Sequence, residues 1–108
     1  MLDLVVLHEH PEWQKPLFTA LDARGVRYSA YDLKAAAFGA NDLLAARLYF
    51  NQASPSAYVR GHTRAVPYAL ALIEDLEEQG ARVLNGSRAF RLELSKIAQA
   101  RLMRALDI

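Results

Sequence analysis

A continuous apolar run near the amino terminus, Leu4-Val5-Val6-Leu7, most strongly limits what this chain can fold into. Such a run is typical of a strand buried on both faces, as in a parallel sheet covered by helices on either side. A segment with helical spacing over 13–24 and a β-rich segment over 26–31 follow, separated by Gly25. Because Pro16 lacks an N–H, we expect it in the first turn of that helix. Together these segments predict a β-α-β unit.

The rest of the chain continues this alternation of short strands and helices. The further predicted elements are a strand over 47–50, a helix over 63–79, a strand over 82–84, one helical turn over 88–92 and a helix over 96–106. Residues 32–45 are assigned to a connection, and Ser95 is the expected cap of the last helix. The pattern predicts a three-layer α/β fold, with a mostly parallel open sheet of about four strands and helices on both faces.

Two helices carry apolar faces that we expect to be buried. In the helix over 63–79 the face consists of Val66, Ala69, Leu70, Ile73 and Leu76. In the last helix it consists of Ala98, Leu102, Met103 and Leu106. Apolar residues at this spacing form one stripe along a helix, and such a stripe normally faces the core.

Composition limits the class of protein further. A chain of 108 residues with 53% apolar and 23% charged residues is one ordinary globular domain. No apolar run approaches the ~20 residues of a membrane span, and no basic segment of a signal peptide precedes the first strand. The chain has no cysteine, which excludes disulfides and agrees with a cytoplasmic protein. The formal net charge of +1 gives no electrostatic case for binding nucleic acid.

The loop after the third predicted strand is the richest candidate binding site. Asn51, Ser54, Ser56 and Arg60 place amide, hydroxyl and guanidinium groups between a strand end and a helix start. Such a set suits a carboxylate or phosphate, because these groups donate hydrogen bonds to anions near a helix amino terminus. An ordinary turn and helix cap with a solvated Arg60 explains the same residues, and the sequence alone does not choose between the two.

The segment His8-Glu9-His10 follows the first predicted strand. Two histidines at this spacing can ligate a metal, but no third ligand is near and His62 is remote in sequence. A polar loop at the edge of the sheet is therefore the favoured interpretation. The absence of a glycine-rich fingerprint after this strand argues against a dinucleotide site.

Two features of the last part of the chain complete the candidate site. Asn85-Gly86 is a tight-turn pair that follows the fourth predicted strand, and its simplest role is conformational. Lys96 opens the last helix, so its ammonium group adds positive charge where anions gather in open α/β sheets. The plainer alternative is a surface lysine beside a helix cap.

A series of short motifs occurs in a definite order from the third strand onward. They are Asn51-x-x-Ser54-Pro55-Ser56, Arg60-Gly61-His62, Gly80-x-x-Val83-x-Asn85-Gly86, Ser95-Lys96 and the closing Leu106-Asp107-Ile108. This ordered set resembles the amino-terminal (pre-ATP-grasp) domain of ribosomal protein S6 glutamate ligase-type ATP-grasp proteins. The resemblance covers nearly the whole chain and is strongest from Asn51 onward.

The resemblance implies a Rossmann-like pre-ATP-grasp domain spanning 1–108. It also implies an ATP-dependent carboxylate–amine or carboxylate–thiol ligase, in which ATP makes an acyl phosphate that a nucleophile then captures. Its partners would be a downstream ATP-grasp domain, which supplies the Mg²⁺-binding carboxylates and the flap over the triphosphate, and a small-molecule or peptide carboxylate. Because phosphoryl transfer depends on those absent parts, we expect the 108-residue chain alone to be inactive.

The resemblance also assigns roles to individual residues. Lys96 would contact an ATP phosphate, while Asn85 and Gly86 would line the cleft that faces the ATP-grasp domain. The loop that runs from Asn51 through Ser54 and Ser56 to Arg60 would meet the substrate. Relatives commonly carry an arginine where this chain has Gln52, and Arg60 is the residue that would take its place.

A free-standing α/β binding or protein-interaction domain is the alternative function. A receiver-like module is the best-defined version of it, and it needs aspartates after the first and third strands. This chain has His8-Glu9-His10 and Asn51-Gln52 at those places, so that version fails on its chemistry. A domain that serves only for interaction remains open.

Overall fold

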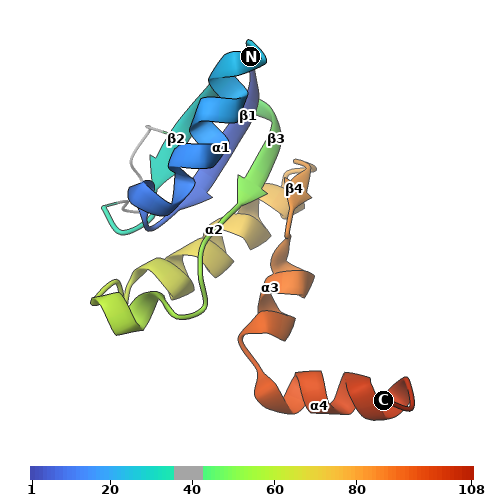
Figure 1. Cartoon of the computed structure of the whole chain (residues 1–108). Coiled ribbons are helices and arrows are strands. Elements are labelled where there is room, and N and C mark those ends of the chain that lie inside the picture. The colour runs from blue at the N-terminus through green and yellow to red at the C-terminus, as the bar shows by residue number, and fades with distance from the viewer. Residues whose placement is uncertain (36–42) are drawn as a thin grey trace.

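The computed structural model describes residues 1–35 and 43–108. Within these ranges the chain forms a parallel sheet in the order β2-β1-β3-β4 (Figure 1). The strands are β1 (Leu2–His8), β2 (Tyr28–Asp32), β3 (Ala46–Asn51) and β4 (Val83–Leu84). Leu4 in β1 is paired with Tyr28 on one side and with Leu48 on the other. The predicted α/β class with an open parallel sheet is therefore confirmed.

Helices cover both faces of the sheet. The helices of the described residues are α1 (Pro11–Ala23), the 3₁₀ helix η1 (Ala57–Arg60), α2 (Ala65–Glu78), α3 (Ser87–Glu93) and α4 (Lys96–Ala105), of which α4 does not lie on the sheet. Alternate residues of β1 point to opposite faces. Val5 belongs to the core cluster that contains the α2 residue Ile73, whereas the ring of His8 contacts Phe18 of α1 edge-on. Burial on both faces explains why every residue from Leu4 to His8 is buried.

The larger part of the core lies between the sheet and α2. Ile73 and Ala69 of α2 are fully buried there, and α3 adds the fully buried Phe90. A hydrogen bond of 3.0 Å between the hydroxyl groups of Tyr31 in β2 and Tyr68 in α2 lies within this layer. The sheet and its two helical layers therefore pack together as one body. The loops that follow the strands lie at the carboxyl ends of the strands.

The structure corrects the expected position of Pro16. Helix α1 begins at Pro11, because Nδ1 of His10 accepts a hydrogen bond of 3.3 Å from the backbone N–H of Trp13 and so caps the helix. Pro16 consequently lies inside the helix, and the prediction that it occupies the first turn was wrong. The proline ring leaves the carbonyl of Glu12 without its usual helical donor.

The apolar face of α2 was predicted in part. Ala69, Ile73 and Leu76 are buried as expected, but Val66 and Leu70 are only half-buried. Tyr68 and Leu72 are buried in addition, together with Ala65. The buried stripe is therefore rotated slightly around the helix, because α2 packs against the sheet and also against α3.

The prediction that the last helix buries its apolar face was wrong. Leu102, Met103 and Leu106 are 44%, 51% and 61% exposed, and Ala98 is half-buried. Figure 1 shows the cause, since α4 projects away from the sheet and packs mainly against α3. Periodicity marks an apolar face correctly but does not say whether anything in the chain covers it.

Smaller differences concern element boundaries. The second strand starts at Tyr28 rather than at residue 26, and the single helical turn expected over 88–92 is the seven-residue helix α3. Residues 33–35 and 43–45 carry no helix or strand, as expected of a connection, and its remaining residues, 36–42, lie outside the described residues. In the ranges that the structure describes, no helix has the length and apolar character needed to cross a membrane.

Candidate functional site

The sheet order places a reversal of chain direction between β1 and β3. The chain adds β2 on one side of β1 and β3 with β4 on the other, so its direction across the sheet reverses there. In open α/β sheets ligands bind at such a reversal, beyond the carboxyl ends of the strands. The N–H of Gln52 donates a hydrogen bond of 2.8 Å to the carbonyl of Leu7, which keeps the loop after β3 beside the end of β1.

A buried carboxylate stands at this point. Glu9 directly follows β1 and is 1% exposed. It accepts hydrogen bonds from Nη2 and Nε of Arg60, the latter at 3.3 Å, and its Oε2 is paired with Nδ1 of His62. We call Glu9, Arg60 and His62 the Glu9 cluster. It joins the end of β1 to the last residue of η1 and to the segment that leads from η1 to α2.

In the Glu9 cluster, the negative carboxylate of Glu9 lies between the guanidinium of Arg60 and the imidazole of His62. Burial raises the pKa of the Glu9 carboxyl, but the hydrogen bonds and charges of Arg60 and His62 outweigh this effect. The net result is a pKa below the ordinary value, so Glu9 is ionised at neutral pH. A buried charge of this kind is tolerated only when it is paired and hydrogen-bonded, as it is here.

The remaining contacts of Arg60 lead to the hydroxyl groups of the loop. Its Nη1 donates a hydrogen bond of 3.3 Å to Oγ of Ser56, which lies 2.8 Å from Oγ of Ser54. The guanidinium carbon is 4.4 Å from the ring centroid of Trp13, a cation–π contact. Trp13 is itself 58% exposed and stacks on His10. The predicted residues Ser54, Ser56 and Arg60 therefore do lie together.

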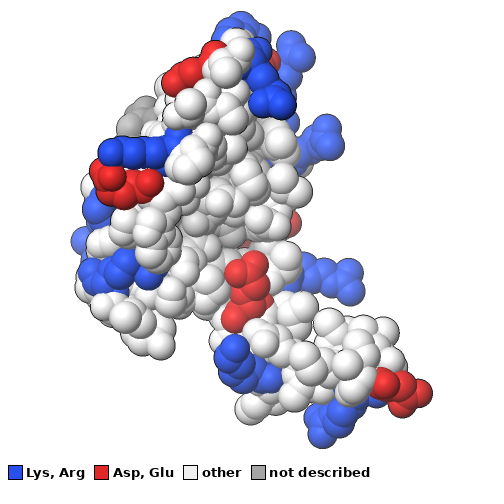
Figure 2. Space-filling model, viewed as in Figure 1, with Lys and Arg blue, Asp and Glu red and all other residues white. Residues whose placement is uncertain are grey.

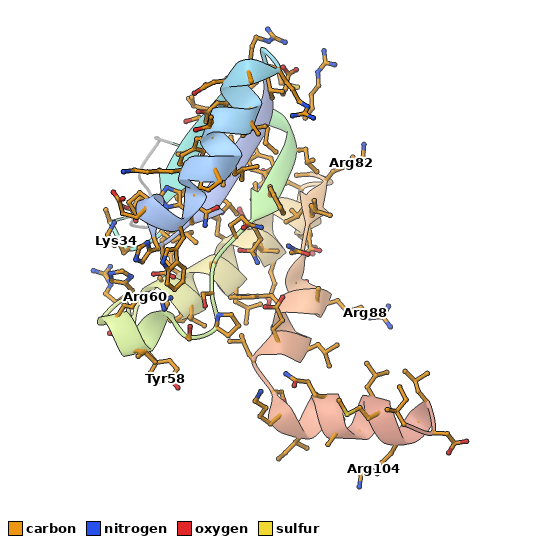
Figure 3. The ribbon with its side chains drawn as sticks, in the orientation of Figure 1. Lys34, Tyr58, Arg60, Arg82, Arg88 and Arg104 are labelled. Carbon is orange, nitrogen blue, oxygen red and sulfur yellow. The ribbon has the colours of Figure 1, made fainter. Side chains whose placement is uncertain are left out.

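A pocket adjoins the Glu9 cluster. It has a volume of about 390 Å³ and is lined by Lys34 and by residues 61–65, including His62 and Arg64. Lys34 is also paired with Asp32 at the end of β2. Figure 3 shows Lys34 and Arg60 at the end of the molecule where β1 and β2 finish, far from Arg104 on α4. His62 belongs to both the cluster and the pocket, so it connects them.

His8 occupies the opposite face of β1 from the Glu9 cluster. It is 3% exposed, and its Nδ1 has no hydrogen-bond partner among the described residues. Burial lowers the pKa of His8, although the charge of Asp32 acts in the other direction. His8 is therefore neutral at neutral pH. No group of three His, Asp or Glu side chains in the described part of the chain is placed to hold a metal ion.

Asn51 and Asn85 brace the ends of β3 and β4. Nδ2 of Asn51 donates to the carbonyl of Asn85 at 3.1 Å, and Nδ2 of Asn85 donates to the carbonyl of Asn51 at 3.2 Å. Oδ1 of Asn51 also accepts the N–H of Ala53 at 3.0 Å. Asn85 has a φ of 59°, a left-handed conformation that asparagine tolerates. These contacts give both side chains a structural role at the strand ends.

Gly86 is placed by packing. A Cβ atom there would lie 2.8 Å from Oε2 of Glu77, whose Oε1 accepts the N–H of Ser87 at 3.2 Å. The carboxylate of Glu77 therefore accepts a hydrogen bond from the first residue of α3, and the missing side chain of Gly86 leaves room for that carboxylate. Asn85 and Gly86 thus form the connection between β4 and α3.

Lys96 opens α4, apart from the loop that carries Ser56 and Arg60. It is exposed at the start of α4, and no described residue pairs with its ammonium group. Oγ of Ser95 accepts the N–H of Ala98 at 3.0 Å, so the predicted cap is confirmed. Because α4 packs mainly on α3, the structure does not bring Lys96 together with Ser56 or Arg60.

Sequence reasoning missed the roles of Glu9 and His62. The segment around Glu9 was interpreted as a polar loop, whereas the structure buries its carboxylate. A usable signal did exist, because the carboxyl ends of parallel strands share one edge of the sheet. Once β1 and β3 are known to be neighbours in the sheet, a carboxylate directly after β1 and an Arg-x-His motif after β3 are therefore expected to meet.

On the displayed face of the described residues, charged side chains form no broad patch of one sign (Figure 2). Figure 2 shows Lys and Arg interspersed with Asp and Glu on the face that it displays, and a largely uncharged surface on the part formed by α4. Comparison of the chain with protein-family models, with curated proteins and with solved structures finds no match. The fold and the site thus define an α/β domain with a polar candidate site at the reversal of its parallel sheet.

Proposed function

We propose that this chain is the amino-terminal, substrate-side domain of a cytoplasmic ATP-dependent carboxylate–amine or carboxylate–thiol ligase that proceeds through an acyl phosphate. The observation that carries the proposal is the Glu9 cluster together with Ser54 and Ser56 at the reversal between β1 and β3. A polar, cation-bearing site at this position of an open parallel sheet suits a small molecule with a carboxylate.

Arg60 is well held for such a role. Glu9 fixes two of its nitrogens, and the indole of Trp13 supports the plane of the guanidinium. The third nitrogen, Nη1, donates a hydrogen bond to the hydroxyl group of Ser56, which is itself bonded to that of Ser54. An arginine whose conformation is fixed in advance loses little entropy when it binds a ligand. We assign these donors to the carboxylate of the substrate.

The ATP-binding half of the reaction belongs to a partner domain in this proposal. Lys96 would contact an ATP phosphate there, and carboxylates of the partner would hold Mg²⁺. Support comes from α4, whose exposed apolar residues Leu102, Met103 and Leu106 are of the kind that a packed domain would cover. In the complete enzyme, Lys96→Ala should raise the Michaelis constant for ATP by the equivalent of ~1.5–3 kcal/mol, one charge-assisted contact.

The same exposed face of α4 favours the second candidate function, a binding or interaction domain without catalysis. The two functions differ at the carboxyl ends of β1 and β3, because only the ligase proposal requires a small substrate to bind there, beside the Glu9 cluster. Interaction through α4 alone would leave this site unoccupied. A ligand titration therefore separates the two.

The test is an amide ¹H–¹⁵N NMR titration of the 108-residue chain. Glycine serves as the probe, since it carries a carboxylate and an amine, and MgATP is titrated separately. We expect saturable shifts from glycine in residues 52–62 and weak binding of MgATP. Shifts confined to α3 and α4, or no shifts, would reject a substrate site at the sheet edge. Tight Mg²⁺-dependent ATP binding by this chain alone would contradict the assignment of ATP binding to the partner domain.

A further inference from the structure

The pairing of Glu9 with His62 is a carboxylate–imidazole dyad. Glu9 is buried and ionised, and it meets Nδ1 of His62. A carboxylate that accepts a hydrogen bond from one ring nitrogen fixes the proton there and leaves the other nitrogen as a proton acceptor. Nε2 of His62 makes no hydrogen bond with any described residue. The side chain is 22% exposed and lines the pocket.

The residues around the dyad determine which kind of ligand can reach Nε2 of His62. The pocket contains the cationic side chains of Lys34, whose ammonium group is also paired with Asp32, and of Arg64. No carboxylate is among its lining residues in the described part of the chain. Arg64 has no ion-pair partner among the described residues. In the described part of the chain, Arg60 hydrogen-bonds to Glu9 of the dyad and not to the ring of His62. A ligand that fits these groups carries an anionic group for Lys34 and Arg64 and a proton for His62 to accept.

We propose that His62 is the base that deprotonates the acceptor amine, and that the acceptor is an amino acid or peptide whose carboxylate lies against Lys34 and Arg64. Glu9 is a positioning residue that acts through His62. This inference rests on the proposed ligase function, which leaves the acceptor and the base unassigned. It also explains why Glu9 is buried beside a histidine as well as beside an arginine.

His62 removes a proton from the acceptor before the C–N bond forms. Nε2 of His62 takes one proton from the ammonium group of the acceptor and becomes an imidazolium. The free amine attacks the carbonyl carbon of an acyl phosphate, so a C–N bond forms and the C–O bond to phosphate breaks. The phosphate leaves with the electron pair and takes the second proton of the nitrogen. The imidazolium then returns its proton to water.

The first test is the tautomer of His62, read from ¹H–¹⁵N long-range correlations of the imidazole ring. The proposal requires the neutral ring to carry its proton on Nδ1 and to leave Nε2 unprotonated. A neutral ring protonated on Nε2 overturns it. Glu9→Gln should increase the fraction protonated on Nε2, because the amide is a weaker acceptor than the carboxylate.

The second test supplies the acyl phosphate directly, so that no ATP-binding domain is needed. Acetyl phosphate and glycine are mixed with the chain, and the rate of N-acetylglycine formation is measured. Wild type should accelerate the reaction. His62→Gln should lower the acceleration about 10²-fold. His10→Asn is the matched control, since asparagine keeps the helix cap and His10 lies outside the pocket.

The outcomes separate the inference from the function on which it rests. If glycine shifts no amide in residues 52–62, the substrate-side function itself fails. If glycine binds there and wild type gives no acceleration, or His62→Gln matches wild type in rate, the base assignment is overturned and the proposed function stands. If His10→Asn loses as much rate as His62→Gln, the assignment to His62 is likewise overturned.

Discussion

Replacing Glu9 by glutamine tests the physical basis of the site. Glu9→Gln keeps the size of the side chain but removes a buried charge from between Arg60 and His62. Breaking a fully buried ion pair costs about 3–5 kcal/mol. Here the two partners are 20% and 22% exposed, so water can partly solvate them after the change. We therefore expect a loss of about 2–4 kcal/mol in the free energy of unfolding.

The assay is urea unfolding at pH 7, followed by circular dichroism and by the fluorescence of Trp13, the single tryptophan of the chain. Glu12→Gln is the matched control, because Glu12 pairs with Lys15 on the surface, with both side chains about two-thirds exposed. That variant should unfold at nearly the same urea concentration as wild type. If the two variants are equally stable, Glu9 does not carry the electrostatic role that we assign to it.

Three further outcomes are expected. The pKa of the Glu9 carboxyl is lowered in the folded state, so its contribution to stability is present above the ordinary carboxyl range and is lost as the pH falls through the lowered value. In acid unfolding, the stabilities of wild type and Glu9→Gln should therefore converge at low pH. Asn51→Ala should cost about 1–3 kcal/mol in urea unfolding, since it leaves backbone groups at the ends of β3 and β4 without partners, and an unchanged midpoint would contradict the bracing role. Met103→Ala on α4 should change the thermal midpoint little, whereas Ile73→Ala in the core should cost about 2–5 kcal/mol; equal losses would mean that α4 is covered in solution.

The sheet was predictable because its signals are local. The apolar run of β1 is long enough to be buried on both faces, and the turn residues that bound each element lie within a few positions of it. Boundaries failed where a side chain outside the apolar pattern sets the end, as His10 does for α1. The exposed face of α4 could not be predicted, because the same periodicity describes a helix with and without a covering layer.

The site was predictable only in part for a different reason. Ser54, Ser56 and Arg60 are close in sequence, so their meeting follows from one loop. Glu9 and His62 are 53 positions apart, and their contact depends on β1 and β3 being neighbours in the sheet. Strand order is a long-range property that composition and spacing do not determine. Without it, a buried carboxylate after β1 has the same sequence signature as a polar loop.

The central claim is that small substrates bind at the sheet edge beside the Glu9 cluster. Trp13 reports on that edge directly, because its ring lies against the guanidinium of Arg60. Titration of wild type with glycine at constant ionic strength should give a saturable change in Trp13 emission, and Ser56→Ala, which removes the hydroxyl facing Arg60, should weaken the binding. An emission spectrum that does not change with glycine, in a folded protein, would contradict the claim.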